Sequence, residues 1–174
     1  MLDHFLLSWS RFTQGRYWVL ITSVFSHNLL WHFVLNMFVL NNFGRILETV
    51  LGPWRFLRFY IVAGIIGSFG HILVSAFLLH EPALPALGAS GAISGLVVLF
   101  CFLFPKEKIL LLGLIPVSAF WGAFLLIGLD VWGLVAQSNG GGLPIGHGAH
   151  LGGAFTGIFY YLLIRSKRPP AAIT

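Results

Sequence analysis

The 174-residue chain is 57% hydrophobic and only 9% charged, with a mean hydropathy of +0.90. Because soluble domains carry about 25% charged residues, this chain has too little charge to cover a water-facing surface, and its composition predicts a single-domain membrane protein. We interpret the net charge of +5 as loop charge that orients the chain in a bilayer, and we expect no nucleic-acid partner. The single cysteine, Cys101, excludes a disulfide within the chain.

The first 27 residues are too polar to cross a bilayer, because Arg11, Gln14 and Arg16 interrupt them. Tryptophan and tyrosine among basic residues are typical of a segment that lies in the membrane interface. We therefore expect residues 1–27 to form an interfacial amphipathic segment. They do not have the basic start and small-residue cleavage site of a signal peptide.

Five apolar segments then approach the length of about 20 residues that a membrane-spanning helix needs. They predict an all-α, polytopic transmembrane bundle over residues 28–164, followed by a basic cytoplasmic or matrix tail over 165–174. The predicted spans are residues 28–47, 57–79, 88–104, 109–134 and 148–164.

Positive charge orients these spans. The basic residues lie in the segments after spans one, three and five and at the span ends beside them, whereas the other two loops hold Glu81 and no Lys or Arg. By the positive-inside rule the basic side is cytoplasmic or faces the matrix, so spans one, three and five all enter from the outer side. The basic residues are Arg45, Arg55, Arg58, Lys106, Lys108, Arg165, Lys167 and Arg168.

Three polar patches open these three spans and should lie at one depth. Polar side chains inside a membrane are costly and usually functional, so their coincidence predicts a site. Span one opens with His27, His32 and Asn36, span three with Ser90, and span five with His147 and His150.

Small residues indicate how the patches could meet. Gly91 with Gly95, and Gly153 with Gly157, have the spacing that lets two membrane helices approach closely. A serine hydroxyl needs a neighbouring base to become a nucleophile, and histidine is a suitable one. We therefore predict that His150 activates Ser90.

An oxyanion would be stabilised at the same place. Free N–H groups near a helix start favour negative charge, which makes the backbone at Ser90 and Gly88 a candidate donor set. The side chains of His32 and Asn36 are candidate donors from span one.

Other polar residues receive structural interpretations. Asp130 lies inside span four without an evident partner, so we expect it to be structural or to face a polar cavity, not to complete a triad. His4, His71 and His80 are expected at the interface, and Cys101 in packing.

Four sequence motifs resemble those of rhomboid intramembrane serine proteases. They are "GASG" around Ser90, "AHLGGAFTG" at 149–157, "HNLLWHFVLN" at 27–36 and "FGRILETVLG" at 43–52. The first and second are most similar to the mitochondrial presenilin-associated branch and its bacterial relatives. Two positions depart from the family pattern, Val19 after Trp18 and Ser94 where many bacterial members have tyrosine.

This resemblance implies peptide-bond hydrolysis in or beside the transmembrane helices of membrane-protein substrates. It implies a Ser90–His150 dyad without a catalytic aspartate, oxyanion roles for His32 and Asn36, and a structural role for Glu48. It implies no metal or cofactor, and a location in a bacterial or mitochondrial inner membrane. Because the family core has six helices, we expect one further span ahead of this chain.

Two other functions remain open on the sequence alone. One is a catalytically inactive rhomboid-like protein that binds and retains membrane proteins, although such proteins lack the serine or the histidine. The other is a subunit of a metal or proton transporter, because His27, His32, His147 and His150 could form an imidazole cluster.

Overall fold

The computed structural model describes residues 4–111 and 114–166 and confirms an all-α bundle of the expected class. One small β-hairpin is the exception. In chain order the elements are α1 (Trp9–Thr13), α2 (Val19–Thr22), the 3-10 helix η2 (Ser23–Phe25), α3 (Leu30–Leu51), α4 (Pro53–Leu73), the π-helical turn η3 (Val74–Leu78), α5 (Ser90–Leu103), β1 (Lys108–Leu111), β2 (Ile115–Ser118), α6 (Ala119–Ser138) and α7 (His147–Ser166).

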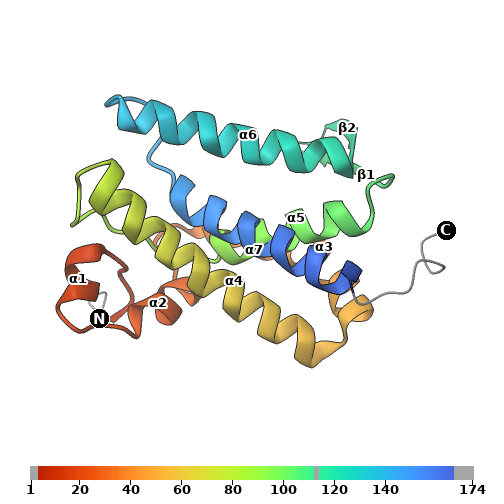
Figure 1. Cartoon of the computed structure of the whole chain (residues 1–174), viewed down its shortest axis with the longest axis horizontal. Coiled ribbons are helices and arrows are strands. Elements are labelled where there is room, and N and C mark those ends of the chain that lie inside the picture. Colours follow the sequence, from red (N-terminus) through yellow and green to blue (C-terminus); the bar gives the residue numbers. More distant parts are fainter. Residues whose placement is uncertain (1–3, 112–113, 167–174) are drawn as a thin grey trace.

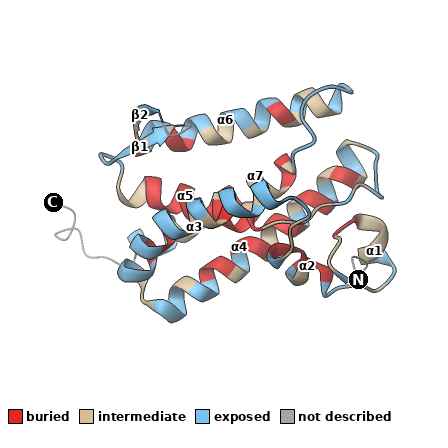
Figure 2. Cartoon of the chain, turned by 180° about the vertical axis from the view of Figure 1, so that it is seen from behind, coloured by how far each residue is buried: buried red, intermediate tan, exposed pale blue. Residues whose placement is uncertain are grey.

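The centre of the bundle is formed by α4, α5 and α7, with α6 along one side and the N-terminal helices beside α4 (Figure 1). Helix α5 is the most enclosed, and Figure 2 shows buried residues on the faces that the central helices turn toward one another. The core cluster includes Leu47, Phe59, Ala63, Leu96, Leu99 and Ala123. Outward-facing side chains of α3 and α6 are large and apolar, which suits a lipid environment.

Glycines bring α4 and α7 within backbone contact. A Cβ at Gly152 would lie 2.7 Å from the carbonyl oxygen of Ile66, and one at Gly67 would lie 2.9 Å from that of Ala149. No larger residue fits there without moving a backbone. Close approach of this kind replaces the hydrophobic effect as the source of helix association in lipid.

Length and hydropathy alone identify fewer spans than the five we predicted. Within the described ranges, Pro53–Leu78 and Ala119–Ser138 each qualify, and Val19–Phe25 with Leu30–Leu51 would add a third as a pair bent by 90°. Helix α5 is apolar but has only 14 residues. A helix does occupy each of the five predicted regions. Polar residues and glycines lower the mean hydropathy of α7.

The predicted start of the fourth span is wrong. Residues 109–111 and 115–118 are not helical; instead β1 and β2 form an antiparallel pair in which Ile109 faces Val117. Pro116 has no backbone N–H and would interrupt a helix, so α6 begins only at Ala119. A short apolar run does not distinguish strand from helix.

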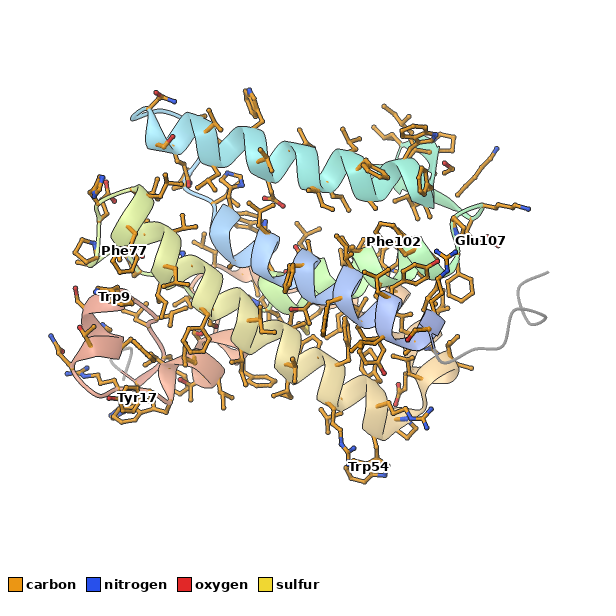
Figure 3. The ribbon with its side chains drawn as sticks, viewed as in Figure 1. Trp9, Tyr17, Trp54, Phe77, Phe102 and Glu107 are labelled. Carbon is orange, nitrogen blue, oxygen red and sulfur yellow. The ribbon has the colours of Figure 1, made fainter. Side chains whose placement is uncertain are left out.

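The N-terminal segment packs beside α4 and η3. Leu7 forms a backbone bridge with Ala86 in the loop before α5, and the rings of Trp9 and Phe77 meet at 5.0 Å (Figure 3). Val19 is fully buried. The interfacial location of this segment stays a prediction, as does the basic tail, whose Lys167 and Arg168 lie outside the described residues.

Candidate active site

Ser90 and His150 face each other across two helices. Ser90 is the first residue of α5 and His150 lies in the first turn of α7. The distance from Ser90 Oγ to His150 Nε2 is 3.0 Å, although 60 residues separate them in sequence. Both side chains are half-buried, so they are shielded from bulk solvent but still reachable.

The small residues beside this pair meet between α5 and α7 in the way the spacing suggested. A Cβ at Gly153 would overlap the carbonyl oxygen of Gly91, and one at Gly157 would overlap that of Gly95. A Cβ at Gly95 would lie 2.6 Å from the carbonyl oxygen of Gly153. The absence of side chains on these glycines therefore sets the spacing that brings Ser90 to His150.

Asp130 joins this pair, which the sequence analysis did not anticipate. Its Oδ1 lies 2.9 Å from His150 Nδ1 and 2.7 Å from His147 Nδ1. Asp130 therefore has two histidine partners that are distant from it in sequence. The predicted topology held the signal that was missed: span four is predicted to end on the outer side, so an acid near that end is expected at the depth of the three polar patches.

A cavity of about 670 Å³ opens beside Ser90 and His150. His32 and Asn36 from α3 line it too, so helices α3, α5 and α7 all contribute polar residues to its wall. Asn36 is 6% exposed, and its Nδ2 donates to His27 Nε2 at 2.8 Å. The same nitrogen of His27 lies 3.4 Å from the Ala89 N–H, which ties α3 to the residue before Ser90.

Gly88 has a different role from the one we expected. Its N–H already donates to the carbonyl of Ser23 at 2.9 Å, so this arrangement does not offer it to an oxyanion. Its φ is +129°, and a Cβ there would lie 2.7 Å from His32 Cε1. Gly88 thus provides room for the imidazole ring of His32.

His71, for which an interfacial position was predicted, is buried within the protein in α4. It is 5% exposed, and its Nε2 lies 3.1 Å from the carbonyl oxygen of Leu84. Because Leu84 belongs to the loop that leads into α5, His71 anchors the approach to Ser90. Glu48, to which the resemblance assigns a structural role, is exposed in the last turn of α3.

One group of side chains is compact enough to hold a metal ion. Among the described residues it consists of Asp130, His147 and His150, whose ligand atoms lie within 4.8 Å of one another. The four-histidine cluster considered from the sequence does not form as such a group; His27 and His32 make their own ring contact at 5.2 Å. The short N–O distances at Asp130 are those of hydrogen bonds.

Comparison with known proteins identifies the family of the chain. The family model of the Rhomboid domain matches residues 14–167. RHOMBOID-like protein 12, mitochondrial, of Arabidopsis thaliana is 33% identical over 180 residues, covering 97% of this chain and 52% of that protein. Presenilin-associated rhomboid-like protein A, mitochondrial, of Danio rerio is 37% identical over 158 residues, covering 87% and 39%. Rhomboid protein 1, mitochondrial, of Saccharomyces cerevisiae is 36% identical over 141 residues, covering 81% and 40%.

The chain spans about half, or less, of the length of these relatives. No solved structure shows a significant match to it. The family model covers most of the chain, and the apolar helices confirm an integral membrane protein. The chain therefore belongs to the rhomboid family, in the branch of its presenilin-associated mitochondrial members.

Proposed function

We propose that the chain is an intramembrane serine endopeptidase that hydrolyses peptide bonds in or next to transmembrane helices. Membership of the family supports the coarser statement that it is an intramembrane protease or a rhomboid-like protein. The observation that carries the finer proposal is the 3.0 Å separation of Ser90 Oγ from His150 Nε2 beside a cavity. A nucleophile and a base within hydrogen-bond reach are the minimum for acyl transfer.

The reaction begins with proton transfer. His150 Nε2 takes the proton of Ser90 as Oγ bonds to the carbonyl carbon of the substrate, and the carbonyl oxygen becomes an oxyanion. His150 then gives that proton to the amide nitrogen, the C–N bond breaks, and the amine product leaves an acyl-enzyme on Ser90.

A water molecule completes the cycle. It loses a proton to His150 as its oxygen attacks the acyl carbon, and the second oxyanion collapses with cleavage of the bond to Ser90 Oγ. His150 returns the proton to Ser90. The cavity supplies a place for this water at a depth where lipid would otherwise exclude it.

Three groups are proposed to stabilise the oxyanion. The side chains of His32 and Asn36 line the cavity with Ser90, and the Ser90 N–H lies at the start of α5, where the helix dipole favours negative charge. Donors that point at developing charge are worth several kcal/mol in serine proteases, about 2.7–4 for one donor in a soluble enzyme.

The substrate class follows from the setting. A site among membrane helices receives a peptide from the bilayer, so we propose single-pass membrane proteins whose helix can unwind near the cavity. We place the enzyme in a mitochondrial or bacterial inner membrane, in keeping with relatives that are named as mitochondrial.

The test is cleavage of a generic single-pass substrate by the protein in liposomes, together with fluorophosphonate labelling. Ser90→Ala and His150→Ala should each abolish cleavage while the protein stays inserted. Ser94→Ala is the matched control, since Ser94 lies one turn further along α5 and is also half-buried. A purified Ser90→Ala protein that cleaves at the wild-type rate would refute the proposal.

The two other functions give different results in the same assay. An inactive retention factor would bind the substrate without cleaving it and would leave Ser90 unlabelled. Metal-dependent chemistry would be lost on treatment with EDTA, whereas the proposed protease should cleave equally well with and without chelator.

A further inference from the structure

We propose that Asp130 and His147 form a positioning pair that holds His150 in the one tautomer able to activate Ser90. This inference rests on the proposed function and adds a third and a fourth residue to the two that the sequence motifs carry. The observation is that both histidines direct Nδ1 at the same oxygen, Oδ1 of Asp130.

The hydrogen bonds select the tautomer. An ionised carboxylate can only accept, so each Nδ1 that approaches Asp130 must carry a proton. In neutral His150, Nε2 then carries no proton and can accept one through its lone pair. Nε2 is the atom that faces Ser90 Oγ. Without Asp130 the proton could sit on either nitrogen, and the form with Nε2–H could not accept the serine proton.

His147 has no evident role except to support Asp130. The residue is 6% exposed, and its Nε2 is buried without a hydrogen-bond partner among the described residues. A proton on that nitrogen would find no acceptor, so the neutral form with Nδ1–H fits the site, and this N–H donates to Asp130. His147 thus acts on Ser90 only through Asp130 and His150.

Gly133 makes room for this arrangement. It lies one turn after Asp130 on α6, and a Cβ there would overlap the imidazole ring of His147. The ring therefore lies directly against the α6 backbone, with its polar edge turned to the carboxylate. Helix α6 thus supplies Asp130 and the space at Gly133, and α7 supplies His147.

The pair is also suited to the charge that forms during the reaction. When His150 takes the serine proton it becomes a cation, and Asp130 lies 2.9 Å from its Nδ1. The side chain of Asp130 is 17% exposed, so little water screens the interaction. Two N–H donors on one oxygen also hold the carboxylate in place before the reaction, which avoids reorganisation.

The first experiment measures the tautomer directly. Histidine ¹⁵N resonances distinguish Nδ1–H from Nε2–H, and assignment follows from the spectrum of His150→Gln. We expect a single Nδ1–H form of His150 in the wild type and a mixture containing Nε2–H in Asp130→Ala. A wild-type-like tautomer in a folded Asp130→Ala protein would overturn the proposal. This readout needs no proteolysis, so it stands even if the proposed function fails.

The second experiment measures cleavage. Asp130→Asn should lower kcat on the order of 10²-fold or more with KM nearly unchanged; the corresponding change in a soluble serine protease lowers kcat by about 10⁴-fold. His147→Phe should lower kcat by a smaller factor, because His150 keeps its own bond to Asp130. Loss of cleavage in Ser90→Ala with wild-type kcat in Asp130→Asn would retain the proposed function and refute the positioning pair.

A matched pair of glycine variants separates positioning from general damage to α6. Gly133→Ala should lower kcat because the new methyl group displaces the His147 ring. Gly128→Ala is the control, since a Cβ at Gly128 meets nothing within 4 Å on the same helix. Equal kcat for the two variants, at equal thermal stability, would show that His147 does not support the site.

Discussion

Gly153 of α7 lies against the carbonyl of Gly91 in α5 so closely that a Cβ on Gly153 would overlap that oxygen. Gly91 directly follows Ser90, and Gly153 lies three residues after His150 on the same helix. The distance between nucleophile and base is therefore set by a contact between two residues without side chains.

Replacing Gly153 or Gly157 by Leu should separate α5 from α7. Overpacking a tight interface costs about 1–3 kcal/mol, and here the obstruction is backbone, which cannot rotate away. We expect slower fluorophosphonate labelling of Ser90 together with a lower Tm. Gly128→Leu is the control, because Gly128 is exposed with open space around it. Full labelling at unchanged Tm in the Gly153 variant would contradict the contact.

Gly88→Ala should disturb His32 as well as the backbone. A non-glycine residue at a strained positive φ costs about 1–3 kcal/mol, and the new Cβ would also press on the His32 ring. We expect lower kcat. Gly15→Ala is the control for backbone strain alone. Gly15 also has a positive φ, +86°, but a Cβ there would meet nothing within 4 Å.

A double mutant tests that explanation. If the collision matters, Gly88→Ala should cost less in a His32→Ala background than in the wild type. Additive losses would mean that the two residues do not interact.

Asn36→Ala should lower kcat by between about tenfold and 10²-fold, less than the 10²–10³-fold loss seen for a sole oxyanion side chain in a soluble enzyme. The loss should be smaller because His32 and the Ser90 N–H remain. Asn42→Ala is the matched control, because Asn42 lies on the same helix but is exposed. Its Nδ2 donates a hydrogen bond to the carbonyl of Phe38. Steady-state kinetics on both variants in liposomes checks this, and equal kcat values would remove Asn36 from the oxyanion site.

His71→Phe should loosen the loop that leads into α5. The substitution keeps an aromatic ring in the buried position but removes the bond to the carbonyl of Leu84, and an unsatisfied buried polar group costs about 1–3 kcal/mol. We expect a lower Tm and slower labelling of Ser90. His80→Asn serves as the comparison, because His80 is exposed at φ +57°, which asparagine tolerates. A Tm unchanged in His71→Phe would show that the bond does not hold the loop.

Much of the candidate site could be predicted from residue type and topology. A serine between glycines and a histidine before a second glycine pair, on spans that enter from one side, place Ser90 and His150 at the same depth. Those arguments need only spacing, charge and the thickness of a bilayer. The same parity argument predicts that depth for Asp130 as well, although no opposite charge lies near Asp130 in the sequence.

Two predictions differ from the structure: the start of the fourth span and the role of the Gly88 N–H. The run after Lys108 is apolar enough to predict the start of a span, and Pro116 was the one residue that argued against a helix there. In the structure this segment forms the paired strands β1 and β2. Gly88 looked like a free donor because its sequence neighbours are small, yet its N–H bonds to Ser23, 65 positions earlier in the chain.

The sequence by itself determined the membrane setting and the all-α class, because composition and the length of apolar segments can be read along the chain. It also predicted the orientation of the helices and proposed Ser90 and His150 as nucleophile and base. Only the tertiary structure showed which polar side chains meet. Asp130 lies within hydrogen-bond distance of both His147 and His150. Asn36 donates to His27, and His71 contacts the carbonyl of Leu84 in the loop before Ser90. Hydrogen bonds select partners by distance and direction in space, and glycine contacts between α4, α5 and α7 set how closely those helices approach. Spacing along a single chain carries no such information.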